Sequence, residues 1–314
     1  MPKFSIIIPL YNKEKDIKKT LESLLAQTFT DFEAIIVNDG STDGSEAVVK
    51  SFSDKRIKYF NKKNEGVSFT RNFAVTKASA AYIAFLDADD YWYPNHLENL
   101  NNLTLNFPEV CWYATAYEKK HTKNLCIPIQ SKIMKHSSWQ GIISNYFENS
   151  FIDALAWTSA VGMKKDFFLD LKGFDTTITN GAGEDTDLWI RAALKSSLAF
   201  STSITAQHNL QGSNRISHTP TKNRVFMNPD NFLVEEKYNP SLKKYLDLNR
   251  YSFALQHKIA GDKESFIKYS KNINFKNLTP KQQYILKSPK WIINGMLKIQ
   301  KIATIAGYRF SSFK

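Results

Sequence analysis

The chain has 314 residues, of which 42% are hydrophobic and 23% are charged. This balance is typical of a folded globular protein and excludes a disordered chain, and no apolar run reaches the length of a transmembrane helix. The N-terminus also lacks the apolar stretch and cleavage site of a signal peptide. The two cysteines, Cys111 and Cys126, are too few for a disulfide framework. We therefore expect a cytoplasmic protein with two buried free thiols.

The net charge of +12 is concentrated at one end of the chain. Residues 265–314 contain ten Lys or Arg and no Asp or Glu, which leaves only +2 for residues 1–264. A nearly neutral body with a basic tail is typical of proteins that contact an anionic partner, either a membrane surface or a nucleic acid.

Short β-branched runs alternate with amphipathic segments in the first third of the chain, which is typical of βαβ units and a parallel sheet. Strands are expected at 4–8, 33–38, 57–60 and 82–86, and helices at 13–27, 41–52 and 67–78. Further strands are expected at 110–117 and 154–163, and an acidic loop followed by a helix at 183–194.

From about Thr219 the pattern becomes helical and β-branched runs disappear. We expect an α/β domain over 1–218, with helices flanking a Rossmann-like sheet, and a basic helical region over 219–314. Ligands of such sheets bind outside the carboxyl ends of the strands, so the residues at the strand ends are the first candidates for a site.

Three carboxylates, Asp87, Asp89 and Asp90, follow the apolar run at 82–86. A structural alternative is that Asp89 or Asp90 caps the next helix, at about 94–105, since Asp is a favoured N-cap. That alternative leaves Asp87 unexplained. An Asp-x-Asp turn presents two carboxylates on one side, as Mg²⁺ or Mn²⁺ bridging a diphosphate requires.

Other strand ends and loops carry further candidates. Asp39 follows the strand at 33–38, where it either shapes a turn or accepts from a ribose hydroxyl or a base. No Gly-x-Gly-x-x-Gly turn or Walker A sequence accompanies it. Arg71 lies in a helix that begins near Gly66, either as a surface residue or as a cation that neutralises phosphate or holds an active-site carboxylate.

The pair Glu184-Asp185 follows a glycine-containing loop. Acids at a helix N-terminus are favoured by the helix dipole, and the alternative is a general base carried on that loop. His208 is either an ordinary surface or core histidine or a third metal ligand beside Asp89, because Mn²⁺ accepts imidazole.

Five motifs together resemble glycosyltransferase family 2, the inverting group that uses nucleotide sugars and has the GT-A fold. They are "FSIIIPLYNKE", "VNDGSTDGS", "NEGVSFTRNFA", "FLDADDYW" and "GEDTDLW", in this order and spacing, over about residues 3–215. Each motif alone is weak, but five in order are specific.

The resemblance implies roles on the nucleotide side of the site. Pro9 and Tyr11 match the loop that lies against the base, usually uracil, and Asp39 matches the acid that binds the base or ribose. Arg71 matches the arginine near the phosphates, and Asp87 the first acid of the Asp-x-Asp motif, near the ribose.

The resemblance also implies a metal site and a base. Asp89 matches the metal-binding acid, with Mn²⁺ or Mg²⁺ as cofactor, and Asp185 matches the general base, with Glu184 as its neighbour. His208 lies where many members have a late histidine, although the surrounding "AQHNLQGS" departs from the usual Tyr-Arg-x-His. The implied reaction is a metal-assisted single displacement from a nucleoside diphosphate sugar, such as a UDP-sugar, to a hydroxyl.

The basic segment 288–314 mixes apolar residues at helical spacing with positive charges only. It is either an interfacial helix or a core-packing helix with a solvated basic face. An interfacial helix would place the enzyme on the inner face of a membrane, with a glycan or lipid-linked glycan as acceptor.

Three rival functions are less consistent with the sequence. A nucleotidyltransferase would show a glycine-rich loop near the first strand, and "PLYNKEKD" has none. Aromatic residues of a nucleic-acid-binding protein would interleave with the basic tail, whereas here they lie in core-like runs. Intact Asp87, Asp89 and Asp185 argue against a non-catalytic sugar-binding relative.

Overall fold

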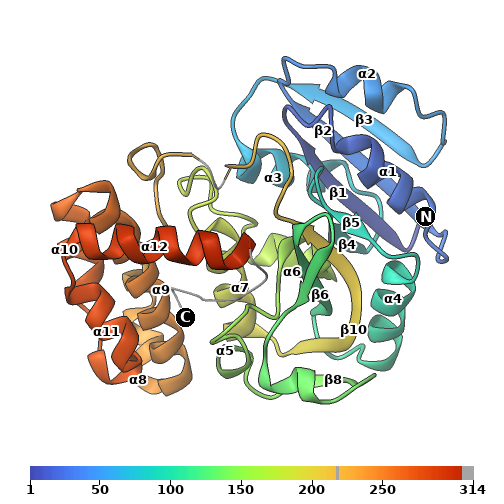
Figure 1. The fold of residues 1–314 in the computed structure, drawn as a ribbon. Helices are drawn as coiled ribbons and strands as arrows, with labels where there is room; N and C mark the ends of the chain where they lie inside the picture. Colours follow the sequence, from blue (N-terminus) through green and yellow to red (C-terminus); the bar gives the residue numbers. More distant parts are fainter. Residues whose placement is uncertain (217–218, 306–314) are drawn as a thin grey trace.

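The computed structural model describes residues 1–216 and 219–305. A mixed ten-stranded sheet flanked by helices is followed by a helical region (Figure 1). The predicted α/β class is confirmed. The path through the sheet is β3-β2-β1-β4-β9-β6-β10-β5, with β7 paired to β6 and β8 to β10.

The first four strands form the parallel part of the sheet, as predicted. They are β1 (Phe4–Leu10), β2 (Phe32–Asp39), β3 (Ile57–Lys62) and β4 (Tyr82–Phe85). The helices between them are α1 (Ile17–Leu25), α2 (Ser45–Lys50) and α3 (Val67–Lys77). Every residue of β2 is buried, because helices cover both faces of this part of the sheet, and this explains its continuous apolar run.

The second half of the sheet is mixed, because β9 runs antiparallel to both β4 and β6. Its strands are β5 (Tyr91–Trp92), β6 (Trp112–Thr122), β7 (Leu125–Pro128), β8 (Gln140–Ile143), β9 (Val161–Lys164) and β10 (Leu198–Asn209). The helices here are α4 (His96–Asn106), α5 (Tyr146–Asn149), α6 (Lys165–Asp170) and α7 (Glu184–Lys195), with 3₁₀ turns η1 (Lys132–Lys135) and η2 (Thr158–Ala160).

Two sequence-based expectations are corrected here, and one strand was missed. The strand expected at 154–163 exists only as β9, because residues 158–160 form a 3₁₀ turn. This turn brings the Ser159 hydroxyl to the Asp90 carboxyl. The long strand β10 was not predicted, although it pairs with β6 along much of its length. The two thiols are free, but Cys111 is half-buried and Cys126 is exposed.

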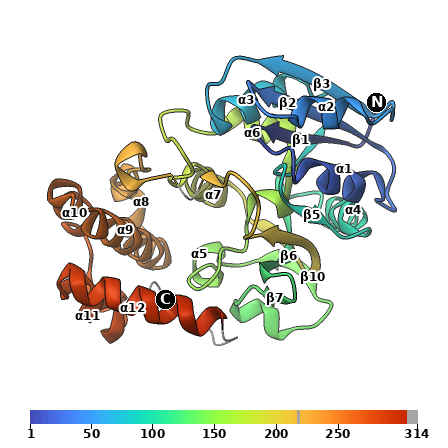
Figure 2. The ribbon, with the colours of Figure 1, turned by 45° about the horizontal axis from the view of Figure 1, so that its top comes forward.

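The chain after β10 is helical, as expected. Its elements are η4 (Thr221–Asn223), η5 (Pro229–Phe232), α8 (Leu233–Tyr238), α9 (Pro240–Ala260), α10 (Lys263–Ser270), η6 (Phe275–Asn277), α11 (Pro280–Lys287) and α12 (Lys290–Ile305). Figure 2 shows these helices grouped beside the sheet, with α12 against α9.

The helical region packs directly on the α/β part through α9. The Asn145 amide donates to Ser241 Oγ at 2.9 Å, and the Tyr146 and Tyr245 rings lie 6.2 Å apart. The domain division between 218 and 219 stays a prediction, and residues 217–218 lie outside the described residues, as do residues 306–314 of the expected membrane segment.

Candidate active site

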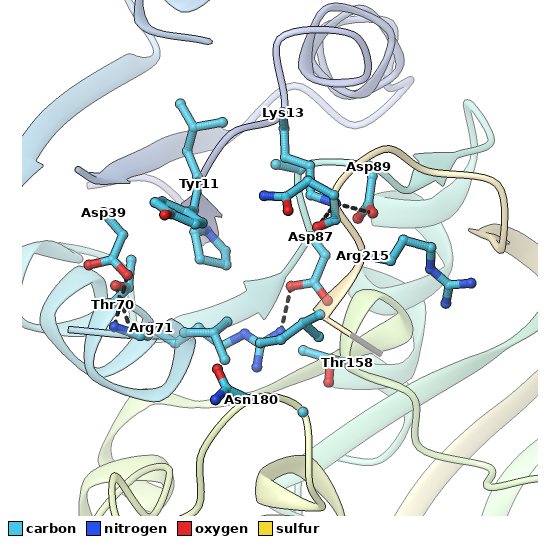
Figure 3. Close-up of a pocket in the computed structure, with 18 of the residues that line it drawn as sticks. Tyr11, Lys13, Asp39, Thr70, Arg71, Asp87, Asp89, Thr158, Asn180 and Arg215 are labelled. Atoms are coloured by element: carbon cyan, nitrogen blue, oxygen red, sulfur yellow. Dashed lines mark hydrogen bonds and ion pairs between the residues drawn. The ribbon is translucent and has the colours of Figure 1, made fainter. Parts of the chain in front are cut away.

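A cavity of about 450 Å³ lies at the carboxyl ends of β1, β2 and β4 and is bounded by the N-terminal ends of α3 and α7 (Figure 3). Its volume is in the usual range for small-molecule sites. All nine residues selected from the sequence line it: Pro9, Tyr11, Asp39, Arg71, Asp87, Asp89, Glu184, Asp185 and His208. Segments far apart in the chain therefore converge on one site, as the rule of strand ends predicts.

Asp39 ends β2, and its carboxylate is occupied by protein donors. Oδ1 accepts from Lys62 Nζ at 2.7 Å and from the Glu65 amide at 3.0 Å, while Oδ2 accepts from the Gly66 amide at 2.9 Å. Gly66 has a φ of +94°, which favours glycine, and it precedes α3. Asp39 thus fixes the loop before α3, and its contact with a base or ribose stays a prediction.

Arg71 is buried, and its guanidinium lies between two acids. Nη2 is 2.6 Å from Asp87 Oδ1, and Nη1 is 3.7 Å from Glu184 Oε1. Of the alternatives left open by the sequence, this geometry matches the one in which the arginine holds active-site carboxylates in place. It also links the end of β4 to the start of α7, which are about a hundred residues apart in the chain.

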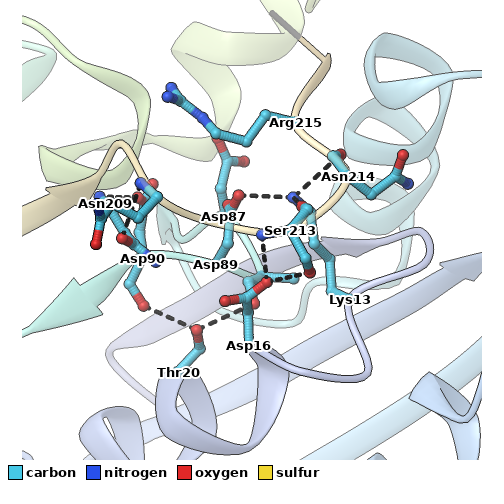
Figure 4. Close-up of polar contacts among 12 residues, drawn as sticks. Lys13, Asp16, Thr20, Asp87, Asp89, Asp90, Asn209, Ser213, Asn214 and Arg215 are labelled. Carbon is cyan, nitrogen blue, oxygen red and sulfur yellow. Dashed lines mark hydrogen bonds and ion pairs between the residues drawn. The ribbon is translucent and has the colours of Figure 1, made fainter. Parts of the chain in front are cut away.

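Asp89 has a cation partner that the sequence did not reveal. Lys13 Nζ lies 2.6 Å from Asp89 Oδ2 and also donates to the backbone carbonyls of Ser213 and Asn214 (Figure 4). Burial raises the pKa of Asp89, and the neighbouring ammonium of Lys13 opposes that shift.

Asp90 does not cap the helix that follows it, which corrects the capping alternative. The N-cap of α4 is Asn95. The buried Asp90 carboxyl instead accepts from Ser159 Oγ at 2.6 Å and from the Asn209 amide at 3.0 Å, so it connects η2 and the end of β10. Burial, together with Asp89 and Asp87, raises the pKa of Asp90 well above its usual range.

Glu184 and Asp185 begin α7 and face different surroundings. Glu184 is buried beside Arg71, and burial with the nearby Asp185 raises its pKa to about 7, although Arg71 acts against this. Asp185 is only partly buried, and its Oδ1 accepts from the Thr186 amide at 2.7 Å. Asp185 is therefore the more accessible acid of the pair.

The loop before α7 is fixed by the helical region. Gly183 has a φ of +102°, and a Cβ at this position would lie 2.9 Å from Met227 Cγ. Arg224 donates to the carbonyls of Asn180 and Gly181, and the Met227 amide donates to Ala182 O at 3.0 Å. The residues after 219 thus determine where the acidic pair lies.

His208 lines the cavity but is engaged by protein. Its ring stacks on Trp157 with centroids 4.8 Å apart, and its Nε2 lies 3.2 Å from Arg215 Nη2. Since a guanidinium can only donate, Nε2 accepts. Burial and the nearby cations lower the pKa of His208 to about 3, so the ring is neutral. Its role as a metal ligand stays a prediction.

The carboxylates fit a divalent cation only together with a diphosphate. Within residues 1–216 and 219–305, no group of three His, Cys, Asp or Glu side chains is arranged to hold a metal ion. Asp87 and Asp89 nevertheless both line the cavity and offer the hard oxygen ligands that Mg²⁺ and Mn²⁺ prefer. Phosphate oxygens and water would complete the shell.

Sequence reasoning missed Lys13, Lys62 and Arg224. Lys62 is the last residue of β3, so the rule of strand ends could have selected it. Lys13 follows the end of β1 by three positions, inside the "PLYNKE" motif. Arg224 gives no local signal, because its contact with the loop at 180–181 exists only after the helical region has packed.

Comparisons with known proteins relate the N-terminal half of the chain to one family. Residues 5–153 match the model of glycosyl transferase family 2. An uncharacterized glycosyltransferase of Rickettsia bellii is 33% identical over 239 residues, which are 75% of this chain and 33% of that protein. The glycosyltransferase GlyA of Streptococcus pneumoniae is 40% identical over 100 residues, which are 31% of this chain and 14% of that protein. The chain thus spans about a third, or less, of the length of these relatives.

Solved structures share the fold at low sequence identity. S. aureus TarS 1–349 in complex with UDP-GlcNAc has a TM-score of 0.62 at 18% identity, covering 98% of this chain and 93% of that one. The mannosyltransferase PcManGT of Pyrobaculum calidifontis, in complex with GDP-Man and Mn²⁺, has a TM-score of 0.54 at 14% identity. The match covers 97% of this chain and 76% of that one. Residues 5–153 thus match glycosyl transferase family 2, and the chain shares the mixed α/β, GT-A type architecture of these solved structures.

Proposed function

We propose that this protein transfers a sugar, with inversion, from a nucleoside diphosphate sugar such as a UDP-sugar to a hydroxyl of a glycan or lipid-linked glycan. The observation that supports this best is the convergence of Asp87, Asp89 and Asp185 on one cavity, with Arg71 between the two groups of acids. The TarS structure with UDP-GlcNAc and the PcManGT structure with GDP-Man support a nucleotide sugar as donor.

The nucleotide would lie along the ends of β1 and β2. Tyr11 and Pro9 form the wall next to the base, and Asp39 lies at the same edge. Arg71 acts by orienting the Asp87 carboxylate toward the ribose, because its guanidinium is already paired with two acids. A cation bound by Asp87 and Asp89 would neutralise charge on the departing diphosphate.

Asp185 is the proposed general base. It accepts the proton of the acceptor hydroxyl while that oxygen attacks the anomeric carbon from the face opposite the diphosphate. The C–O bond to the diphosphate breaks as the new glycosidic bond forms, so one base suffices and no sugar–enzyme intermediate is needed. Glu184 stays buried beside Arg71 and keeps the start of α7 in position.

The test is release of nucleoside diphosphate from a panel of UDP- and GDP-sugars, with Mn²⁺ and candidate acceptors. We expect turnover with at least one donor, and a loss of about 10²–10⁴-fold in Asp185→Asn, with nucleotide affinity within about twofold of wild type. Near-normal turnover in this variant contradicts the base assignment. Release of pyrophosphate instead of a nucleoside diphosphate would indicate a nucleotidyltransferase.

The proposal includes contact between α12 and an anionic membrane surface. Three large apolar side chains, Trp291, Ile299 and Ile302, are 74%, 68% and 68% exposed. Their spacing places them on one stripe of the helix. A Cβ added to Gly295, which lies between them, would meet no side chain of the described residues within 4 Å. The exposed Lys290 and Lys298 lie along one side of this stripe.

An apolar stripe with only positive neighbours is typical of a helix that lies in the plane of a membrane interface. None of the described helices combines the length and the apolar character needed to cross a bilayer. An enzyme held at the surface in this way would reach an acceptor whose lipid carrier is in the same membrane.

A further inference from the structure

The loop over residues 210–216, which follows β10, is attached to the loop between β1 and α1 by two side chains. Lys13 Nζ donates to Ser213 O at 2.6 Å and to Asn214 O at 3.3 Å. Asp16 Oδ2 accepts from both the amide and the hydroxyl of Ser213. Figure 4 shows both attachments on the same side of the carboxylate cluster.

The same loop touches Asp89 directly. Gly212 is so close that a Cβ there would lie 2.5 Å from Asp89 Oδ2. That oxygen is also the one that accepts from Lys13 Nζ, at 2.6 Å. The ammonium is therefore surrounded by three oxygens, one carboxylate and two carbonyls, and it is mostly buried, with 12% of the side chain exposed.

The attached loop ends at the cavity wall with a second cation. Arg215 lines the cavity, and its Nη1 donates to Leu210 O at 2.8 Å while Nη2 reaches His208. The guanidinium is thus held at the cavity wall by the Leu210 carbonyl of the loop and by the His208 ring (Figure 3). Whatever fixes the loop also fixes this cation.

We propose that Lys13 is a positioning residue with two effects. Its ammonium neutralises the charge of Asp89. It also holds the 210–216 loop, and therefore Arg215, at the cavity wall. A divalent cation that binds Asp89 through Oδ2, the oxygen that Lys13 contacts, would displace this ammonium. Lys13 thus weakens metal binding and couples it to release of the loop. This inference rests on the proposed nucleotide-sugar site.

The experiment measures two properties without using turnover. The first is Mn²⁺ affinity in the presence of saturating UDP, from the electron paramagnetic resonance signal of free Mn²⁺. The second is hydrogen exchange in peptides covering residues 210–216, without metal or nucleotide. The variant Lys13→Met removes the ammonium, and Lys13→Gln removes only its charge while keeping a donor for the carbonyls.

For both Lys13 variants we expect Mn²⁺ to bind on the order of tenfold more tightly, because a charge-assisted contact no longer competes. In Lys13→Met, the backbone amides of the 210–216 loop should also exchange hydrogen on the order of tenfold faster than in wild type. Asp16→Ala, which loosens the loop but leaves Lys13 on Asp89, should show faster exchange in the loop and a smaller gain in Mn²⁺ affinity than the Lys13 variants, because the ammonium still competes at Asp89. Lys15→Met, at an exposed position in the same loop as Lys13, should change neither property.

Unchanged or weaker Mn²⁺ binding in both Lys13 variants overturns the competition, and unchanged exchange in Lys13→Met overturns the attachment of the loop. If the wild type binds no UDP with Mn²⁺, the proposed function fails and this inference fails with it. If the wild type binds both and the Lys13 variants match it, only this inference fails.

Discussion

Arg71 and Asp87 form the contact that organises the site, with Nη2 of the guanidinium 2.6 Å from Oδ1 of the carboxylate. The other arm of the guanidinium faces Glu184 at 3.7 Å. One buried cation therefore compensates two acids from opposite sides of the cavity. Removing it leaves the buried Glu184 carboxyl without its cation, and breaking a buried ion pair by removing one partner is strongly destabilising.

Arg71→Met is therefore expected to lower the free energy of unfolding by about 3 kcal/mol. The double variant Arg71→Met/Glu184→Gln should recover part of this loss, because the more deeply buried acid is then neutral. Urea unfolding of the single and double variants measures both effects. If the double variant is less stable than the sum of the two single changes predicts, Arg71 does not act by compensating Glu184.

The raised pKa of Glu184 predicts a pH-dependent stability. Burial raises this pKa to about 7, above the ordinary value of 4.5, so the folded protein binds the proton more tightly than the unfolded chain. The resulting stabilisation is fully present below about pH 4.5 and is lost as the pH rises through about 7, with a magnitude on the order of 3 kcal/mol.

Glu184→Gln tests this linkage because it keeps the shape of the side chain and removes the titration. Between about pH 5 and about pH 7.5, the variant should gain stability relative to wild type. The measurement is urea unfolding of both proteins across this range. A constant difference between them shows that Glu184 does not titrate there.

Gly183→Ala tests how tightly the loop before α7 is fixed. The φ of +102° disfavours any L side chain, and the new methyl would meet Met227 at 2.9 Å. We expect a loss of stability of about 2 kcal/mol. We also expect a loss of turnover, since the change moves the start of α7 and, with it, Asp185. Thermal unfolding and the donor assay measure the two effects.

Gly295→Ala is the matched control. This glycine lies inside α12, and a Cβ there would meet no side chain within 4 Å in the part of the chain that the structure describes. Because alanine favours the helix, the variant should be more stable than wild type by about 0.5–1 kcal/mol. Equal effects of the two substitutions would show that the backbone conformation at Gly183 is not the constraint.

The exposed stripe of α12 predicts binding to anionic vesicles. The double variant Trp291→Ser/Ile299→Ser should reduce the partition coefficient by at least about tenfold, since two apolar side chains no longer enter the interface. Sedimentation with phosphatidylcholine vesicles, with and without phosphatidylglycerol, measures this. Leu105→Ser, an exposed leucine of α4 that is 62% accessible, should have no effect. Equal sedimentation of all three proteins rules out α12 as the contact.

The parallel half of the sheet was predictable because its strands are buried on both faces. Continuous β-branched runs in β1 and β2 are visible in the sequence, and the parallel topology then brings Asp39 and Asp87 to one edge. The strand β10 was missed because it contains many hydroxyl residues, whose polarity hides its pairing with β6. The strand expected at 154–163 was too long because an apolar run does not reveal a 3₁₀ turn.

The sequence by itself predicted nine of the residues that line the cavity, since motifs at strand ends depend only on local pattern and order along the chain. The tertiary structure decided how these residues are paired. Arg71 holds Asp87 and Glu184, Lys13 pairs with Asp89, and Asp90 accepts from the end of β10 and does not cap a helix. Such pairings depend on distances of a few ångströms between segments that are far apart in sequence, and only the packed chain sets those distances.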